Sequence, residues 1–75
     1  MANNANKGKL PFPAGYYEGE ILDGKPHGKG KYTWSDGSYY EGDFINNKRH
    51  GIGKMTYPDG RIEEGNWKDG EFVGE

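Results

Sequence analysis

The sequence predicts an all-β fold: a single-layer antiparallel meander of tandem 23-residue β-hairpin repeats. Three observations predict this fold. Glycines and aromatic residues recur at a fixed 23-residue spacing, residues within each unit alternate with a period of two, and short turn sequences separate the alternating runs. The 75 residues are 31% hydrophobic, which is too little for a conventional two-layer core. Six tyrosines, three phenylalanines and two tryptophans nevertheless favour a folded chain over a disordered one.

The 16 residues before the repeats lack this pattern. Residues 1–9 are polar and without periodicity, so we expect a disordered leader there. We expect residues 10–16 to form an N-terminal cap. Its two prolines cannot donate hydrogen bonds to a sheet, which suits an edge, and Phe12 is placed to pack on the first hairpin. The initial Met1 favours a complete small protein.

The repeat domain is expected to span residues 17–75. Two full units, 17–39 and 40–62, are followed by a partial unit, 63–75. The glycines that coincide between units are Gly19 with Gly42 and Gly65, Gly28 with Gly51 and Gly74, Gly30 with Gly53, and Gly37 with Gly60.

Each unit contains two kinds of predicted turn. The sequences SDG (35–37) and PDG (58–60) predict three-residue loops with Gly37 and Gly60 in the left-handed conformation. The sequences DGKP (23–26) and NNKR (46–49) are interpreted as longer loops.

Together these turns predict a register in which large residues alternate with glycine across the sheet. The expected pairs are Gly19 with Gly30, Gly30 with Gly42, Tyr32 with Tyr40, Gly28 with Phe44, Ile21 with Gly28, and Phe44 with Gly51. One row is then entirely glycine, at 19, 30, 42, 53 and 65, and a neighbouring row reads Ile21, Gly28, Phe44, Gly51, Trp67, Gly74. We expect the aromatic rings to lie over the bare backbone of these glycines.

The opposite face of the predicted sheet carries alternating charges. Its central row is Glu18, Lys31, Glu41, Lys54, Glu64. Exposed pairs of this kind each contribute only a few tenths of a kcal/mol, but like charges would disfavour a slipped register. We interpret this face as solvent-exposed, with its charges helping to fix the register of the strands.

Several functions are disfavoured by composition and spacing. The chain has no cysteine, which removes disulfides, thiolate nucleophiles and cysteine metal sites. Ser35 and Ser38 have no histidine within reach in the predicted register, so we expect no enzyme and no cofactor. His27 and His50 would lie about 10 Å apart, too far to share a metal ion. The absence of any long apolar run favours a cytoplasmic protein.

The segments YEGEILDGKPHGKGKYTWSDG and YEGDFINNKRHGIGKMTYPDG closely resemble MORN (membrane occupation and recognition nexus) repeats, and the resemblance covers residues 16–75. The chain departs from the motif at Ile21, Met55 and Glu63. The resemblance implies an elongated twisted sheet with a groove along one face. It also implies a scaffold or adaptor that holds a helix or extended peptide, often as a homodimer joined through C-terminal repeats. Phospholipid binding is a further function that the family suggests.

The leading functional hypothesis is therefore a protein-interaction module with an aromatic groove. A single sheet has no second layer, so some rings must stay exposed and available to a partner. Trp34 and Tyr57 are the strongest candidates, whereas Phe44 and Trp67 also fit a core role. The full set of expected partner-binding residues is Tyr32, Trp34, Tyr40, Phe44, Tyr57 and Trp67. The unprotected edge at residues 65–75 is expected to support self-association.

Two alternative functions compete with this hypothesis. Binding to an anionic membrane surface would use basic residues on the long-loop edge and in the leader. These are Lys25, Lys48, Arg49, His50, Lys7 and Lys9. Stacking of single-stranded nucleic acid on the aromatic residues conflicts with the net charge of −2 and is the least favoured function.

Overall fold

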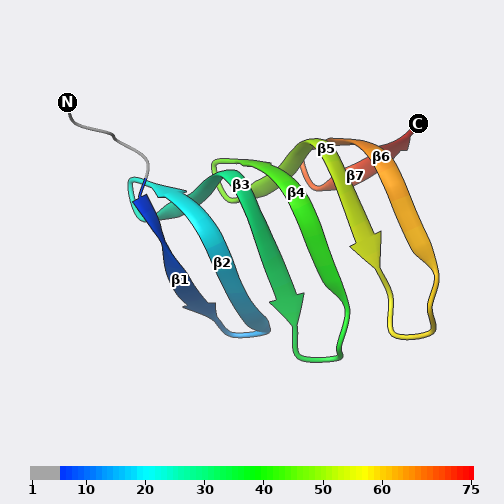
Figure 1. Ribbon diagram of the computed structural model, residues 1–75, viewed down its shortest axis with the longest axis horizontal. Helices are drawn as coiled ribbons and strands as arrows, with labels where there is room; N and C mark the ends of the chain where they lie inside the picture. Colours follow the sequence, from blue (N-terminus) through cyan, green and yellow to red (C-terminus); the bar gives the residue numbers. More distant parts are fainter. Residues whose placement is uncertain (1–5) are drawn as a thin grey trace.

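The computed structural model describes residues 6–75, which form one open seven-stranded antiparallel sheet in the order β1 to β7 (Figure 1). Each strand pairs only with its neighbours in sequence, which confirms the predicted single-layer meander. The molecule is elongated, with extents of 42 × 26 × 16 Å. The strands are β1 (Asn6–Phe12), β2 (Gly15–Leu22), β3 (Lys25–Trp34), β4 (Tyr39–Ile45), β5 (Lys48–Thr56), β6 (Ile62–Lys68) and β7 (Glu71–Gly74).

The three-residue loops are confirmed at the β3–β4 and β5–β6 turns. In the first of these, the Trp34 amide donates to the Ser38 carbonyl at 2.9 Å. Gly37 has a φ of 98° and Gly60 a φ of 94°, the left-handed conformation that the sequence predicts. The Asp36 carboxylate also accepts hydrogen bonds from the backbone N–H and the hydroxyl of Ser38, which fixes the loop from within.

The loops at the opposite end differ from the prediction. The sequences interpreted as longer loops contain two-residue turns instead, and the β6–β7 hairpin has the same form. In each turn both central residues have positive φ, for example 53° at Asp23 and 75° at Gly24. This is the type I′ geometry, whose twist matches that of the flanking strands. The three turns, called here the hairpin tips, are residues 23–24, 46–47 and 69–70.

Because these turns are shorter than predicted, the strand after each turn has extra residues relative to the segment with which it pairs. A β-bulge in each of the pairs β2–β3, β4–β5 and β6–β7 accommodates the extra residues. Gly19 still pairs with Gly30, but Ile21 pairs with Pro26 rather than Gly28. The same correction applies one and two units later, where Phe44 pairs with Arg49 and Trp67 with Phe72. The predicted alternation of large residue and glycine therefore holds only where Gly28 meets Phe44 and Gly51 meets Trp67.

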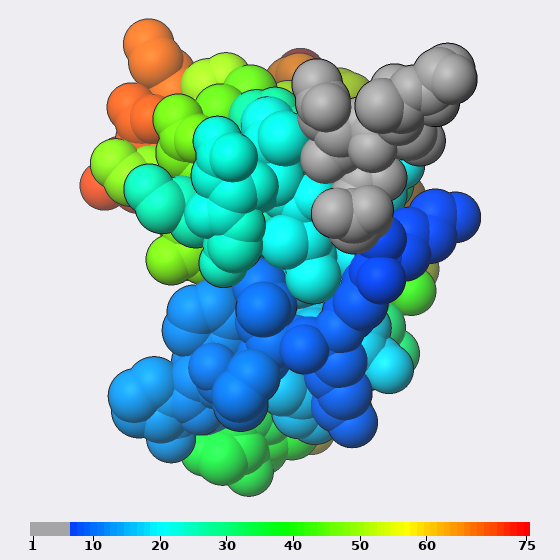
Figure 2. Space-filling model, turned by 90° about the vertical axis from the view of Figure 1, so that its left-hand side faces the viewer, coloured from blue at the N-terminus to red at the C-terminus, as the bar shows by residue number. Residues whose placement is uncertain are grey.

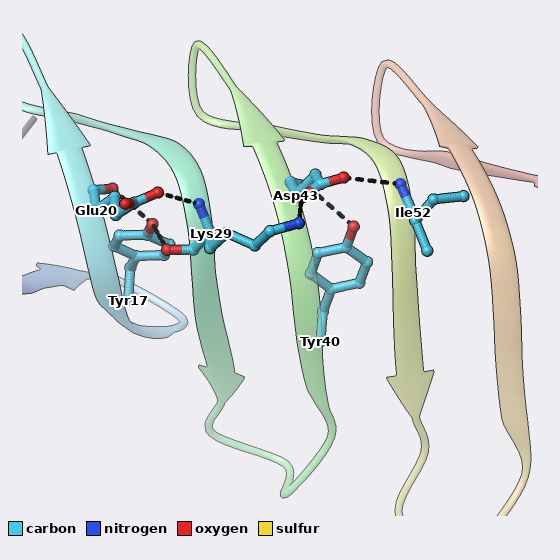
Figure 3. Close-up of polar contacts among 6 residues, drawn as sticks. All are labelled: Tyr17, Glu20, Lys29, Tyr40, Asp43 and Ile52. Atoms are coloured by element: carbon cyan, nitrogen blue, oxygen red, sulfur yellow. Dashed lines mark hydrogen bonds and ion pairs between the residues drawn. The ribbon is translucent and has the colours of Figure 1, made fainter.

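A carboxylate completes the hydrogen bonding of each bulge in the first two units (Figure 3). Glu20 accepts a 2.6 Å hydrogen bond from the Lys29 backbone N–H, and Asp43 accepts one of 3.0 Å from Ile52. The Lys29 ammonium also forms a 2.6 Å ion pair with Asp43. Although partial burial raises the pKa of Asp43, the hydrogen bonds from Lys29 and Ile52 outweigh it and lower that pKa overall.

The predicted glycine row is confirmed, with 19, 30, 42, 53 and 65 side by side across five strands. The rings that cover it are Tyr17 over Gly30 and Tyr40 over Gly53. Around them lies a small core in which rings from the same unit and from neighbouring units meet edge to face, at centroid distances of 4.9 to 5.2 Å. The buried apolar residues are Tyr17, Tyr40, Phe44, Met55 and Trp67.

The N-terminal segment is more ordered than the sequence predicts. Residues 6–9, expected to be part of a disordered leader, form the first half of β1, and residues 1–5 of that leader lie outside the described residues. β1 adds Gly8 to the glycine row opposite Gly19. As expected, Phe12 packs on the first hairpins, with its ring 5.5 Å from that of Tyr32.

The charged row on the outer face has the predicted pairing of Glu18, Lys31, Glu41, Lys54 and Glu64. Within residues 6–75, however, the only ion pairs within 4 Å are Lys29–Asp43 and Arg61–Asp59. The Lys31 ammonium instead lies 4.6 Å from the centre of the Tyr39 ring. The row therefore acts through its alternating sign rather than through closed ion pairs.

Candidate functional site

A hollow of about 250 Å³ lies beside the aromatic core, where the bent strands carry the hairpin tips over the sheet. Two of its residues come from β3 and one from β4, and the others come from the tips and the start of β5. They are Tyr32, Trp34, Phe44, Asn47, Lys48, Arg49 and Gly70.

Hydrogen bonds from a tip to the start of the strand that follows the preceding tip build the rim of this hollow. The Asn47 amide donates to the Pro26 carbonyl at 2.9 Å, and one unit later the Gly70 amide donates to the Arg49 carbonyl at 2.9 Å. In Figure 1 the tips lie at the upper end of the sheet, where the strands bend away from the direction of their lower parts. Figure 2, which views the sheet from its β1 end, shows tips of different units projecting to the same side. The tips thus form a ridge along one side of the sheet, called here the ridge of tips.

The aromatic wall of the hollow is a pair of rings that the core leaves partly uncovered. Tyr32 and Trp34 lie two residues apart on β3, so both side chains project from the same face. Their ring centroids are 4.6 Å apart with an interplanar angle of 45°. Both are half-buried and pack against the core, whereas Phe44 at the base of the hollow is buried.

Arg49 closes the other side of the hollow. Its guanidinium carbon lies 5.3 Å from the centre of the Trp34 ring and 5.0 Å from that of Trp67. One guanidinium nitrogen, Nη2, donates a 2.7 Å hydrogen bond to the Gly70 carbonyl of the next tip. Two indole rings and one tip therefore hold this cation in place.

The structure brings three of the six sequence-predicted site residues together in the hollow: Tyr32, Trp34 and Phe44. Tyr40 and Trp67 are buried in the core, at 0% and 4% exposure, where a partner cannot reach their rings. Tyr57 lies apart from the hollow. Its hydroxyl donates a 2.6 Å hydrogen bond to Glu63, the residue that replaces the leading tyrosine in the third unit.

The polar side of the hollow was not predicted as part of a groove. The sequence indicates Arg49 and Lys48 only as edge residues that could contact a membrane, and it gives no sign that Asn47 or Gly70 lines a groove. The equivalents of Arg49 in the other units are Pro26 and Phe72, so the motif itself gives no signal for a cation at this position.

Residues 6–75 contain no group of three or more histidine or acidic side chains placed to bind a metal ion. The Nδ1 atom of His27 accepts a 3.4 Å hydrogen bond from the Asn46 amide. Over the same residues there is no helix whose length and apolarity would allow it to cross a membrane.

Comparison with protein-family models finds the MORN repeat at residues 17–39, 40–60 and 64–75. These three segments coincide closely with the two full units and the partial unit derived from the 23-residue period. No curated protein matches the chain.

Proposed function

The chain belongs to the MORN-repeat family, whose repeats are generally protein- or membrane-interaction modules, and on this basis we propose that it binds a segment of a partner protein. The proposed ligand is a helix or an extended peptide that places a side chain in the hollow beside Trp34. The module is non-catalytic, acts as an adaptor, and is cytoplasmic.

The observation that carries this proposal is the pair formed by Tyr32 and Trp34. These rings are only half-buried and face a hollow, whereas Tyr40, Phe44 and Trp67 are buried in the core. Tryptophan and tyrosine are the residues most enriched at the energetic centres of protein interfaces. Their large rings bury much apolar area while ordering few rotatable bonds.

The rim supports binding in a second way, because it is already ordered without a partner. Backbone hydrogen bonds join Asn47 to Pro26 and Gly70 to Arg49 in the preceding hairpins, and the Arg49 side chain is fixed against Gly70. A preformed site loses less conformational entropy when a ligand binds than a flexible loop would. The chemistry of the lining also favours binding over catalysis, since it includes no histidine, serine or carboxylate.

Self-association through residues 65–75 is a further part of the proposal. Within the described residues β7 pairs with β6 on one side only, so its other edge presents free backbone groups. Val73 on this strand is 62% exposed. Light scattering over a range of concentrations tests this, and a monomer mass throughout the micromolar range would contradict it.

The peptide-binding proposal is tested by selecting peptides from a random phage-displayed library on the intact chain. We expect selected peptides to bind the wild type and Tyr57→Ala equally well and to lose binding to Trp34→Ala. Tyr57→Ala is the matched control because it removes a half-buried ring outside the hollow. A thermal melt of each variant confirms that it is folded. Failure to select any peptide, or binding that is indifferent to Trp34→Ala, would contradict the proposal.

A further inference from the structure

We propose that the hollow is selective for an acidic partner segment, in which an aspartate or glutamate pairs with Arg49 and Lys48 while an adjacent apolar side chain packs on Tyr32 and Trp34. This inference rests on the proposed function and adds the chemical class of the partner.

The first step is the local charge. The lining contains two cations, Lys48 and Arg49, and no carboxylate. The whole chain has a net charge of −2, so the hollow has the opposite sign to the molecule that surrounds it. An anionic group is therefore attracted to the hollow, and a cationic side chain would be repelled by both residues.

The second step is the hydrogen-bonding capacity of Arg49. A guanidinium has five N–H donors in a planar fork that matches a carboxylate. Among the described residues, the Arg49 side chain makes only one hydrogen bond, to the Gly70 carbonyl. Because the indole rings and Gly70 hold the group beside the hollow, a carboxylate meets an ordered cation instead of a mobile one. Lys48, which is exposed on the same rim, adds a second positive charge.

The third step is the apolar wall opposite this cation. The half-buried rings of Tyr32 and Trp34 border the same hollow of about 250 Å³. One ligand can therefore contact both the rings and Arg49 only if it carries an apolar group and an anionic group close together. A short peptide sequence with an acidic residue beside an aromatic or aliphatic one meets this requirement.

The charges along the ridge of tips favour a peptide over an anionic membrane. Recognition of an anionic lipid surface typically uses a cluster of several basic residues on one face. Here the tips and the residues that follow them mix both signs. Among the tips and the two residues that follow each tip, the basic residues are Lys25, Lys48 and Arg49, and the acidic residues are Asp23, Asp69 and Glu71.

The experiment uses peptides selected on the wild-type chain, measured by fluorescence anisotropy. We expect Asp or Glu next to an apolar residue to be enriched among them. Affinity should fall about tenfold in R49Q, the loss expected for one charge-assisted hydrogen-bonded pair. Replacing the acid of the peptide by its amide should produce a similar loss on the wild type and little further loss on R49Q. K54Q is the matched control, because it removes one positive charge from the outer face, and its affinity should stay within about twofold.

The peptide-side substitution keeps the test valid even where R49Q weakens the fold, because it leaves the protein unchanged. Neutral or basic peptides that still require Trp34 would overturn the acidic selectivity while leaving the proposed function intact. Equal affinities for the acidic peptide and its amide would also overturn it. Arg49-dependent and Lys48-dependent binding to vesicles containing anionic lipid, with no peptide selected, would overturn both proposals in favour of a membrane surface.

Discussion

Tyr40 of β4 lies directly against Gly53 of β5, so closely that a Cβ atom at position 53 would overlap the tyrosine ring and its hydroxyl. The same hydroxyl donates a 2.9 Å hydrogen bond to the Asp43 carbonyl beside the bulge. Tyr17 and Gly30 repeat this relationship one unit earlier. The spacing of tyrosine and glycine in the repeat therefore has a steric cause: the ring occupies the space in which another side chain would stand.

Substitution of Gly53 by alanine is expected to destabilise the fold by about 1–3 kcal/mol, because the methyl group must displace a buried ring. The control is Gly8→Ala, in the same glycine row, where the nearest atom is the mobile Cδ1 end of Ile21. There the change should stay within about 1 kcal/mol. Urea unfolding of both variants measures the difference, and equal losses would show that the ring does not impose the glycine.

Stability is expected to fall as the pH rises from about 10 to about 12. Burial raises the pKa of Tyr17 and of Tyr40 from 10.0 to about 12, with neighbouring acidic charges adding to the rise. Unfolded chains release these protons near pH 10 while the folded chain retains them, so the stabilisation is complete below pH 10 and is lost on approaching pH 12.

Tyr40→Phe tests this assignment, since it removes one of the two groups. The urea midpoint of this variant should decline less steeply over that pH range than the wild-type midpoint. Tyrosinate absorbance followed in parallel should show tyrosines that ionise late in the wild type, and one fewer of them in Tyr40→Phe. Identical pH profiles for the two proteins would rule out Tyr40 as a source of the dependence.

The two tryptophans are expected to respond differently to truncation. Trp67→Ala should cost about 3–5 kcal/mol, because it removes a ring that is 4% exposed and whose Nε1 donates to the Gly53 carbonyl at 3.1 Å. Trp34→Ala should cost only about 1 kcal/mol, the worth of its contacts with Tyr32 and Arg49. Calorimetric melting temperatures distinguish these outcomes. A Trp34→Ala variant that melts as early as Trp67→Ala would make Trp34 a core residue.

Glycine at position 47 is expected to stabilise the hairpin tip formed by Asn46 and Asn47. Asn47 has a φ of 69°, which glycine adopts without strain, so Asn47→Gly is expected to stabilise the fold by about 0.5 kcal/mol. Asn47→Val should destabilise it by about 1–2 kcal/mol, because a β-branched residue strongly resists positive φ. Equilibrium unfolding of the pair checks the sign, and a valine variant as stable as the glycine variant would refute the type I′ assignment.

Much of the fold follows from the sequence because alternation and turn chemistry act locally. The glycine row and the pairing of Tyr32 with Tyr40 depend only on which residues share a face and on the length of the three-residue loops. The error at the tips has an equally physical origin. A register shift of two residues leaves every side chain on its original face, so alternation cannot detect it. The Asp23–Gly24 pair did carry a type I′ signal that would have revealed the shorter turn.

The candidate site could be predicted only in part for the same reason. Trp34 is half-buried near a strand end, where part of its ring remains accessible as expected, because its position depends on the three-residue loop alone. Arg49 reaches the hollow because the shorter turn pairs it with Phe44 and the next tip bonds to it. Tyr57 lies outside the hollow and donates a hydrogen bond to Glu63, a residue that replaces tyrosine only in the third unit. Such pairwise details depend on distances that the repeat pattern does not encode.

The meander has one consequence for how the molecule responds to mechanical load. In the sheet formed by residues 6–75, every strand pairs only with the strands before and after it, and β1 and β7 lie at opposite ends. Tension applied between these two strands would pull across the ladder of backbone bonds, peeling one hairpin away while its neighbours stay intact. Such a chain lengthens in successive small steps and absorbs work gradually, as an extensible tether does.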